Sequence, residues 1–280
     1  MSAPVSYLAI GHVTKDLTPD GPRLGGSVAY AALTARALGY PAGVVTACAD
    51  DLDLGALDGV PVRRQPSPHS TTYENLYTPA GRTQYLRGRA APLGADAVPR
   101  EWRPAPLVHL APLTGELDPV LTAAFPDALI GLTPQGFLRG WDDSGRVHPR
   151  AWEAAEQWLP RAGAVVLSLE DAGGDWALLE RWARLAHRLV VTEGPRGCTV
   201  FVRGQGARQF AGPPQTEVDP TGAGDIFAAA FFIHLYETDD PWAAARVANQ
   251  VAGVSVTRAG LAGVPTVDEA GLARLRAEQT

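Results

Sequence analysis

Short apolar runs alternate with longer helical segments along the 280 residues of the chain. Runs rich in β-branched residues and bounded by turn residues predict buried strands, at residues 6–12, 42–47, 106–111, 128–133, 164–169 and 188–194. A hairpin is expected to follow at 198–204 and 207–212. Helical periodicity, or an apolar character all round, predicts helices at residues 28–38, 175–187, 225–236, 241–256 and 267–277. This alternation indicates an α/β fold with a mostly parallel sheet, in a single domain that covers residues 1–280.

Residues 60–90 interrupt this alternation. They have no helical period and alternate as strands around the turn at 78–81, which predicts a small antiparallel β insertion. A solvent-exposed hairpin is one interpretation. A lid over a substrate site is the other, because long insertions in α/β enzymes often cover the active site. The insertion also offers apolar side chains for a lid-to-lid homodimer, namely Tyr73, Leu76, Tyr77, Tyr85 and Leu86.

Charge and composition exclude several classes of partner. The net charge is −6 and no basic run occurs, which disfavours both nucleic acid and anionic membranes. No apolar run approaches the ~20 residues of a membrane span, and the N-terminus lacks the basic region of a signal peptide, so a cytoplasmic protein is expected. Cys48 and Cys198 are predicted to be free thiols. Lys15 is the only lysine and is not followed by Ser or Thr, so the chain has no P-loop.

Two segments combine glycines with a carboxylate at the start of a predicted helix. Gly222-Ala223-Gly224 precedes an apolar helix and leaves backbone N–H groups available to an anion. Asp225 follows at the helix start, where ordinary capping, with a gain of ~0.3–1 kcal/mol, also explains a carboxylate. Asp16 follows the first predicted strand, at the edge where open α/β sheets bind ligands. Gly25-Gly26 then opens an Ala-rich helix and allows close backbone approach to a ligand.

Taken in order along the chain, these segments resemble the ribokinase (PfkB) family of small-molecule kinases. The resemblance covers essentially the whole chain and is carried by Asp16 after the first strand, LGGSVAYAALTARALG, VVTEGPRG, DPTGAGD and GVSVTRAG. It implies a ribokinase-like three-layer fold with a β lid. It also implies transfer of the γ-phosphate of ATP, with Mg²⁺, to a hydroxyl of a sugar or cyclitol.

The resemblance assigns the catalytic base to Asp225 and the anion hole to the amides of Gly222, Ala223 and Gly224. The helix N-terminus is expected to lower the basicity of Asp225, and a modest base suffices for phosphoryl transfer. The acceptor site is assigned to Asp16, Gly25, Gly26 and Tyr30. The nucleotide site is assigned to Thr192, Gly194, Gly197 and Asn249, with Asn249 beside the adenine.

Cation sites follow from the same resemblance. Glu170 and Asp171 are expected to organise Mg²⁺ through water. Asp219, with the carbonyl groups near Val256 and Ala259, is expected to hold a monovalent cation such as K⁺.

Several positions depart from the family pattern. Tyr30 stands where many sugar kinases of the family have Asn, Ser168 replaces the Asn of the magnesium element, and Thr133 and Gln135 replace an acid and an amide. These departures argue against ribose and bring the pattern closer to the inositol kinases. A nucleoside kinase and a catalytically silent nucleotide- or sugar-binding protein remain as alternatives. The remaining aromatic cluster is expected to pack in the core: Trp152, Trp158, Trp176 and Trp182.

Overall fold

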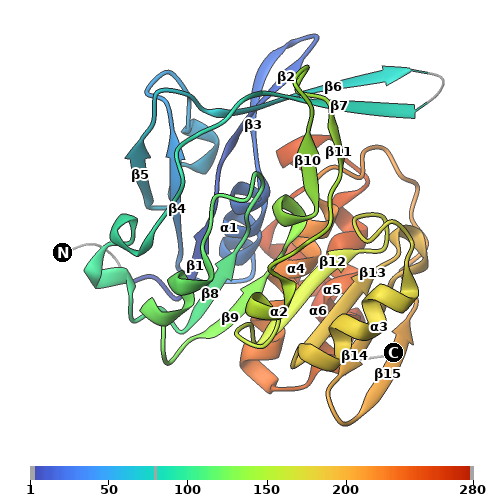
Figure 1. The fold of residues 1–280 in the computed structure, drawn as a ribbon. Coiled ribbons are helices and arrows are strands. Elements are labelled where there is room, and N and C mark those ends of the chain that lie inside the picture. Colours follow the sequence, from blue (N-terminus) through green and yellow to red (C-terminus); the bar gives the residue numbers. More distant parts are fainter. Residues whose placement is uncertain (1–3, 79–80, 278–280) are drawn as a thin grey trace.

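The protein, described here from a computed structural model over residues 4–78 and 81–277, is built on a nine-stranded sheet (Figure 1). From one edge to the other its strands are β15 (Gly206–Phe210), β14 (Cys198–Val202), β13 (Arg188–Thr192), β12 (Ala164–Ser168), β9 (Leu129–Leu132), β8 (Leu107–Leu110), β1 (Tyr7–Ile10), β4 (Ala42–Cys48) and β5 (Val62–Pro66). Neighbours from β13 to β5 pair in parallel, and the hairpin β14–β15 is antiparallel. The predicted strands and the predicted α/β class are thereby confirmed.

Helices cover both faces of this sheet, which gives three layers. One face carries α1 (Ser27–Ala37), α4 (Ala223–Thr238), α5 (Pro241–Ser255) and α6 (Val267–Ala277), and the other carries α2 (Ala155–Trp158) and α3 (Trp176–Leu185). Each face has its own core. Along β1, Tyr7 and Ala9 enter the core of the first face, whereas Leu8 and Ile10 enter the second. A strand that is buried on both sides reads as a continuous apolar run, which is why the sequence pattern located these strands.

Helix α4 is apolar all round because it is enclosed on all sides. It packs between the sheet and the helices α1 and α5, and its residues from Ile226 to Ile233 are buried. Gly131 on β9 makes room for it, since a Cβ there would lie 2.4 Å from the ring of Phe232. The helix begins at Ala223, two residues before the predicted start, with Gly222 as its N-cap.

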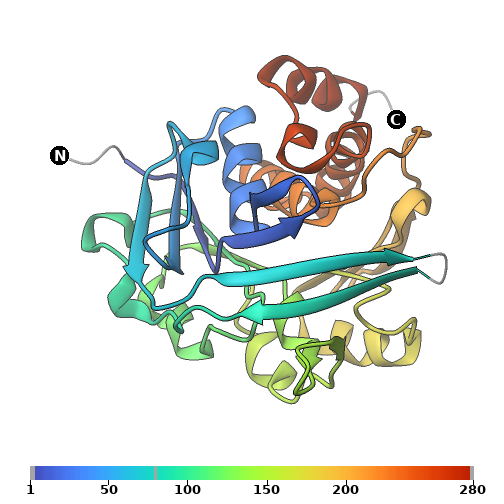
Figure 2. The ribbon, with the colours of Figure 1, turned by 90° about the horizontal axis from the view of Figure 1, so that it is seen from above.

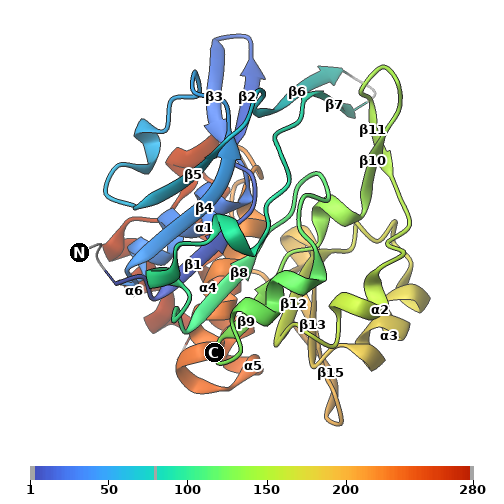
Figure 3. The same ribbon diagram turned by 60° about the vertical axis from the view of Figure 1, so that its left-hand side comes forward.

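A second sheet of four strands stands above the carboxyl ends of the main strands and forms the lid (Figures 2 and 3). Its order is β3 (Gly21–Gly25), β2 (Thr14–Thr18), β6 (Thr71–Thr78) and β7 (Gly81–Gly88). The predicted β insertion is confirmed for β6 and β7, while part of the turn predicted between them, Pro79 and Ala80, lies outside the described residues.

The predicted boundaries of the lid are wrong in two respects. Residues 62–66 form β5, which pairs in parallel with β4 in the main sheet and is not part of the lid. Residues 14–25, expected to be a turn and a helix entry, form the antiparallel strands β2 and β3. The parallel pairing of β2 with β6 depends on contacts far along the chain, so a short polar strand such as TKDLT carries no local signal of it.

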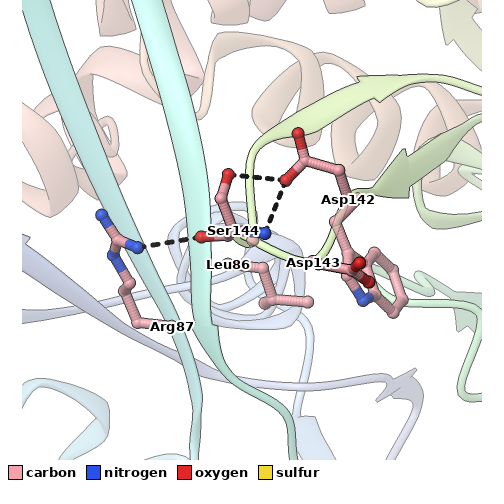
Figure 4. Close-up of a pocket in the computed structure, with 7 residues that line it drawn as sticks. Leu86, Arg87, Asp142, Asp143 and Ser144 are labelled. Carbon is pink, nitrogen blue, oxygen red and sulfur yellow. Dashed lines mark hydrogen bonds between the residues drawn. The ribbon is translucent and has the colours of Figure 1, made fainter.

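Strands β10 (Arg139–Trp141) and β11 (Val147–Pro149) form a small hairpin that contacts the lid. This hairpin was not predicted. The amide of Leu86 donates to the carbonyl of Gly145 at 2.8 Å, which ties β7 to the hairpin turn. In that turn Asp142 accepts hydrogen bonds from the amide and hydroxyl of Ser144, which lower its pKa (Figure 4). Arg87 of the lid donates to the Ser144 carbonyl from the other side.

The aromatic and sulfur-containing residues behave as predicted. Trp152, Trp158 and Trp182 are buried, and Trp152 stacks on Phe137 with ring centres 5.7 Å apart, while Trp176 packs partly buried against the same core. Both cysteines are free and buried. Within the described ranges, no helix combines the length and apolar character that a membrane crossing requires.

Candidate active site

The candidate site lies where helices α1 and α4 begin, at the carboxyl edge of the main sheet and below the lid. Asp225 is in the first turn of α4, and Ser27 is the first residue of α1. The two side chains are joined by a hydrogen bond. The positive ends of two helix dipoles therefore meet at this carboxylate.

Burial controls the acidity of Asp225. Loss of solvent raises its pKa from 3.8 to about 6, against the lowering effects of the Ser27 hydrogen bond and the charge of Arg139. The expectation that the helix N-terminus lowers its basicity is therefore wrong, because desolvation of the carboxylate outweighs the favourable dipole. A carboxylate with a pKa near 6 is a stronger base than an exposed aspartate and is still ionised at neutral pH.

The predicted anion hole has two free amides in place of three. The amide of Ala223 already donates to the carbonyl of Pro220 at 3.1 Å. The amides of Gly222 and Gly224 have no hydrogen-bond partner among the described residues. A Cβ at Gly224 would meet no atom within 4 Å, so an anion can reach the helix start from that side.

Tyr30 forms the wall between the glycine turn and the acceptor side. Gly222 has a φ of 80°, and a Cβ there would lie 2.3 Å from the Tyr30 ring, so only glycine fits. Burial raises the pKa of Tyr30, and the charges of Asp225, Asp16 and Asp219 raise it further. Tyr30 thus lies among three carboxylates as a neutral phenol, which can donate a hydrogen bond.

Asp16 lies on strand β2 of the lid and not in a turn after the first strand. The position expected from the sequence is therefore corrected, because residues 14–18 pair with β3 and β6. A Cβ on Gly25 would lie 2.1 Å from an oxygen of Asp16, so this glycine makes room for the carboxylate. Gly26, with φ at 96°, lies close to the His12 carbonyl. Burial raises the pKa of Asp16 to about 6, opposed by a hydrogen bond from Thr14.

A cavity of about 1000 Å³ is lined by Asp16 and Tyr30, whereas Asp225, Gly222 and Gly224 are not among its lining residues. The lid contributes Asp16, Lys15 and Asn75, helix α1 contributes Tyr30, and the loops around α4 and α5 contribute Asp219 and Gly260. Lys15 is paired with Asp51 at 3.2 Å, so its charge is already offset. The polar groups that remain around the cavity are mostly acceptors of hydrogen bonds, as suits a ligand rich in hydroxyl groups.

The predicted nucleotide residues lie apart from this cavity. Thr192 and Gly194 are at the end of β13, and Asn249 is on α5. The side-chain amide of Asn249 donates to the carbonyls of Phe210 and Ala211, at 3.2 and 3.3 Å. A Cβ at Gly253, one turn further along α5, would lie 2.4 Å from Pro213. The segment after β15 is thus packed on the face of α5 that includes Asn249 and Gly253.

The predicted magnesium residues differ in surroundings. Glu170 is exposed, whereas Asp171 accepts hydrogen bonds from Ser168 at 2.7 Å and from Arg139 at 3.1 Å. Both carboxylate oxygens of Asp171 are therefore engaged, and its charge is balanced by the guanidinium. These residues do not fit a direct magnesium ligand set.

The predicted monovalent-cation residues are also bonded within the chain. Asp219 accepts from the amides of Thr221 and Gly260, each at 2.9 Å. The carbonyl of Val256 accepts from the amides of Val218 and Asp219. This arrangement holds the loop before α4 in place and does not present a ring of free oxygens to a cation.

Thr133 belongs to a buried polar chain. Tyr7 and His109 share a hydrogen bond of 2.7 Å, and His109 and Thr133 share one of 3.1 Å. Burial lowers the pKa of His109 to about 3, so the imidazole is neutral. The threonine at the family's acid position thereby satisfies a histidine in the core, and no buried charge is needed there.

Sequence reasoning missed two residues that act directly on Asp225. The hydrogen bond between Ser27 and Asp225 was not predicted, although Ser27 directly precedes the helix predicted at residues 28–38. Arg139 was not predicted either, because nothing local in the sequence shows that its side chain reaches Asp171 and lies close enough to affect the pKa of Asp225. Only the folded chain brings β10 to this site.

Known proteins resemble this chain in sequence and in fold. Residues 168–267 match the pfkB family carbohydrate kinase, and this segment includes Asp171, Asp219 and Asp225. The matched segment is about a third of the chain. Over 94% of this chain and 98% of the other, the fold matches a solved pyrophosphate-dependent kinase of the ribokinase family, complexed with a pyrophosphate analogue and myo-inositol, with a TM-score of 0.78 at 23% identity. The ribokinase-like fold is thereby confirmed.

Curated relatives are longer than the part this chain matches. The chain is 28% identical to the bifunctional protein HldE of Caulobacter sp. over 95% of this chain and 57% of that protein. It is 35% identical to the inositol 3-kinase of Oryza sativa subsp. japonica over 48% of this chain and 34% of that protein. The chain thus spans between about a third and three fifths of the length of these relatives.

Proposed function

We propose that the protein is a phosphotransferase that moves a phosphoryl group to a hydroxyl of a cyclitol or sugar. The observation that carries this proposal is the position of Asp225. Its carboxylate is desolvated, has a pKa of about 6, and lies beside the free amides of Gly222 and Gly224 at the N-terminus of α4. A base next to an anion-binding turn is the pair of groups that phosphoryl transfer to an alcohol requires.

Asp225 accepts the proton of the acceptor hydroxyl as the new P–O bond forms. The bond between phosphorus and the leaving oxygen breaks in the same step, and the donor departs with its bonding electrons. The amides of Gly222 and Gly224 stabilise the charge on the transferring group. Asp16 and the Tyr30 hydroxyl orient the acceptor, the first by accepting hydrogen bonds and the second by donating one.

A cyclitol fits the acceptor side better than ribose. Tyr30 offers an apolar ring face with a single donor in place of a two-way amide, and Asp16 accepts hydrogen bonds from vicinal hydroxyls. The myo-inositol bound by the solved relative and the inositol 3-kinase similarity support the same class. A nucleoside kinase remains the alternative, since a nucleoside also presents hydroxyls to such a carboxylate.

The donor is expected to be ATP with Mg²⁺, as in ribokinase-family kinases. A second candidate, pyrophosphate, is favoured by the packing of α5. Asn249 is bonded to strand carbonyls and Pro213 lies against Gly253, where a nucleobase is expected. Pyrophosphate needs no base site, and one solved relative depends on it.

A homodimer through the lid would have less apolar surface available than the sequence suggested, because the side chains of Tyr73 and Leu86 are buried within the chain.

The proposal is tested by phosphorus NMR of reactions with purified protein, each of two donors against a panel of inositols, pentoses, hexoses and nucleosides. We expect a phosphomonoester of a cyclitol, absent when Asp225→Asn replaces the wild type. Turnover with nucleosides alone would show that the acceptor is a nucleoside and not a cyclitol or sugar. No product with any acceptor, while ATP or pyrophosphate still binds, would support the silent binding protein.

A further inference from the structure

Arg139 connects the lid to the donor side of the candidate site. It is the first residue of β10, and its side chain is 21% exposed. One Nη donates to the amide oxygen of Gln84 on β7 at 3.2 Å, and the other donates to Asp171 after β12 at 3.1 Å. A single guanidinium thus bridges two elements that are separate in the fold.

The bridge continues at both ends. Gln84 donates to Asn75 on β6 at 3.1 Å, and Asn75 lines the acceptor cavity. Asp171 accepts from Ser168 at the end of β12. A continuous polar path therefore runs from the acceptor wall, through the lid and Arg139, to the strand end where the donor is expected.

The charge of Arg139 also reaches the proposed base. It lowers the pKa of Asp225, whereas Asp171 raises it. The site otherwise gathers carboxylates, since Asp16, Asp219 and Asp225 all surround Tyr30. An anionic phosphoryl donor that enters such a field requires a cation, and guanidinium matches the oxygens of a phosphoryl group in bidentate geometry.

We propose that Arg139 binds the transferring phosphoryl group, leaving Gln84 and Asp171 when the donor enters. This rests on the proposed function. The guanidinium stays protonated throughout, and the proton of the acceptor hydroxyl goes to Asp225. Because Arg139 holds the lid through Gln84 before the donor arrives, its exchange of partners links donor binding to the position of the lid over the acceptor.

The test compares Arg139→Gln and Arg139→Lys with Arg87→Gln. Arg87 is a matched control, since it also lies in contact with the β10–β11 hairpin but pairs with Glu74 at 2.7 Å, away from Asp225. We expect kcat to fall about 10²–10³-fold in Arg139→Gln, the loss typical of one removed transition-state donor. Arg139→Lys keeps the charge without the bidentate fork and should lose less. Arg87→Gln should stay within a few-fold of the wild type.

Binding separates this proposal from the function on which it rests. Inorganic pyrophosphate is titrated calorimetrically into the wild type, Arg139→Gln, Gln84→Ala and Asp225→Asn. We expect affinity to fall at least tenfold in Arg139→Gln and to be kept in Asp225→Asn and Gln84→Ala. A wild type that binds pyrophosphate through Arg139 without turnover would overturn the enzymatic function alone.

Arg139 would be a lid anchor only if Arg139→Gln and Gln84→Ala reduced kcat equally while pyrophosphate affinity stayed at the wild-type value. That outcome overturns the proposal. The acid limb of the pH profile gives a further check, because loss of the cation should move it to higher pH in Arg139→Gln and leave it unchanged in Arg87→Gln. Should Arg139→Gln fail to fold, Arg139→Lys carries the same comparisons.

Discussion

Two carboxylates lie near the base of the lid, Glu116 fully buried and Asp225 partly buried, and they differ in the number of hydrogen bonds they accept. Glu116 is 3% exposed and accepts hydrogen bonds from the amides of His12, Leu113 and Thr114, at 2.7–3.1 Å, and from the Thr114 hydroxyl. Asp225 is hydrogen-bonded to the Ser27 side chain and interacts with the charge of Arg139 at longer range. Buried polar groups in native structures are normally satisfied, so the carboxylate left short of partners is the one available for chemistry.

The surroundings of Glu116 explain its role. His12, which lies next to it, shares a hydrogen bond of 2.7 Å with Thr71 at the start of β6. Thr71 also accepts from the amide of Ala90, just after β7. The cluster of His12, Thr71 and Glu116 therefore fixes both ends of the lid hairpin to the end of β1. Glu116 therefore anchors the lid, whereas Asp225 lies below the lid and is available to a ligand.

The largest expected difference between substitutions of Asp225 and Glu116 is in turnover. Asp225→Asn keeps the shape of the side chain but removes the base, so kcat should fall about 10²–10⁴-fold. Glu116→Gln should leave kcat of the folded protein within a few-fold. Steady-state kinetics on both variants checks this. Equal losses would mean that the two carboxylates do not differ in function.

Stability against pH gives the second test. The pKa of Asp225 is raised from 3.8 to about 6, so the folded state keeps a proton that the unfolded state releases between these values. Its contribution to stability is thus full below about pH 4 and is lost as pH rises through 6. Asp225→Asn removes that loss, and its free energy of unfolding should exceed the wild-type value by up to about 3 kcal/mol at pH 7.

Urea unfolding of both proteins at pH 4, 5, 6 and 7 measures this difference. His109, with its pKa lowered to about 3, contributes the opposite slope because its stability is lost as pH falls. It is present in both proteins and cancels in the comparison. A difference that does not grow with pH would contradict the burial of Asp225.

Glu116→Gln gives the third test. An amide at this position turns one acceptor into a donor that faces backbone N–H groups, so the free energy of unfolding should fall by about 2 kcal/mol. Glu153→Gln on the exposed surface is the control and should change it by less than about 0.5 kcal/mol. Equal stability of the two variants would show that the cluster of His12, Thr71 and Glu116 does not stabilise the fold.

The smallest effects concern the two free amides. Gly222→Ala introduces a methyl group at positive φ against the Tyr30 ring and should cost about 1–2 kcal/mol of stability. Gly224→Ala meets open space in an ordinary helical position, so stability should hold or rise slightly. Its methyl group nevertheless enters the path of an anion, and kcat/KM should fall. Unchanged kinetics for Gly224→Ala would remove this amide from the anion hole.

The sequence predicted what is periodic or local. Local patterns in the sequence predict the parallel strands that are buried on both faces and the apolar helix α4. They also predict the glycine turn that precedes Asp225. The strands β2 and β3 were missed because their composition is polar and because β6, the other partner of β2, is about 55 residues away. The acidity of Asp225 was predicted with the wrong sign, since burial by distant elements, not the adjacent helix end, decides it. Arg139 was missed for the same reason.

The contact between Tyr30 and Gly222 has a consequence for how such an enzyme can change its substrate. Under the proposed function, Tyr30 shapes the acceptor wall and also packs against the turn that would bind the transferring group. A smaller side chain at position 30 would open the acceptor site and, in the same step, leave the turn without support. Selectivity and rate therefore share one structural element, so a lineage that exchanges one polyol for another is expected to alter both positions together.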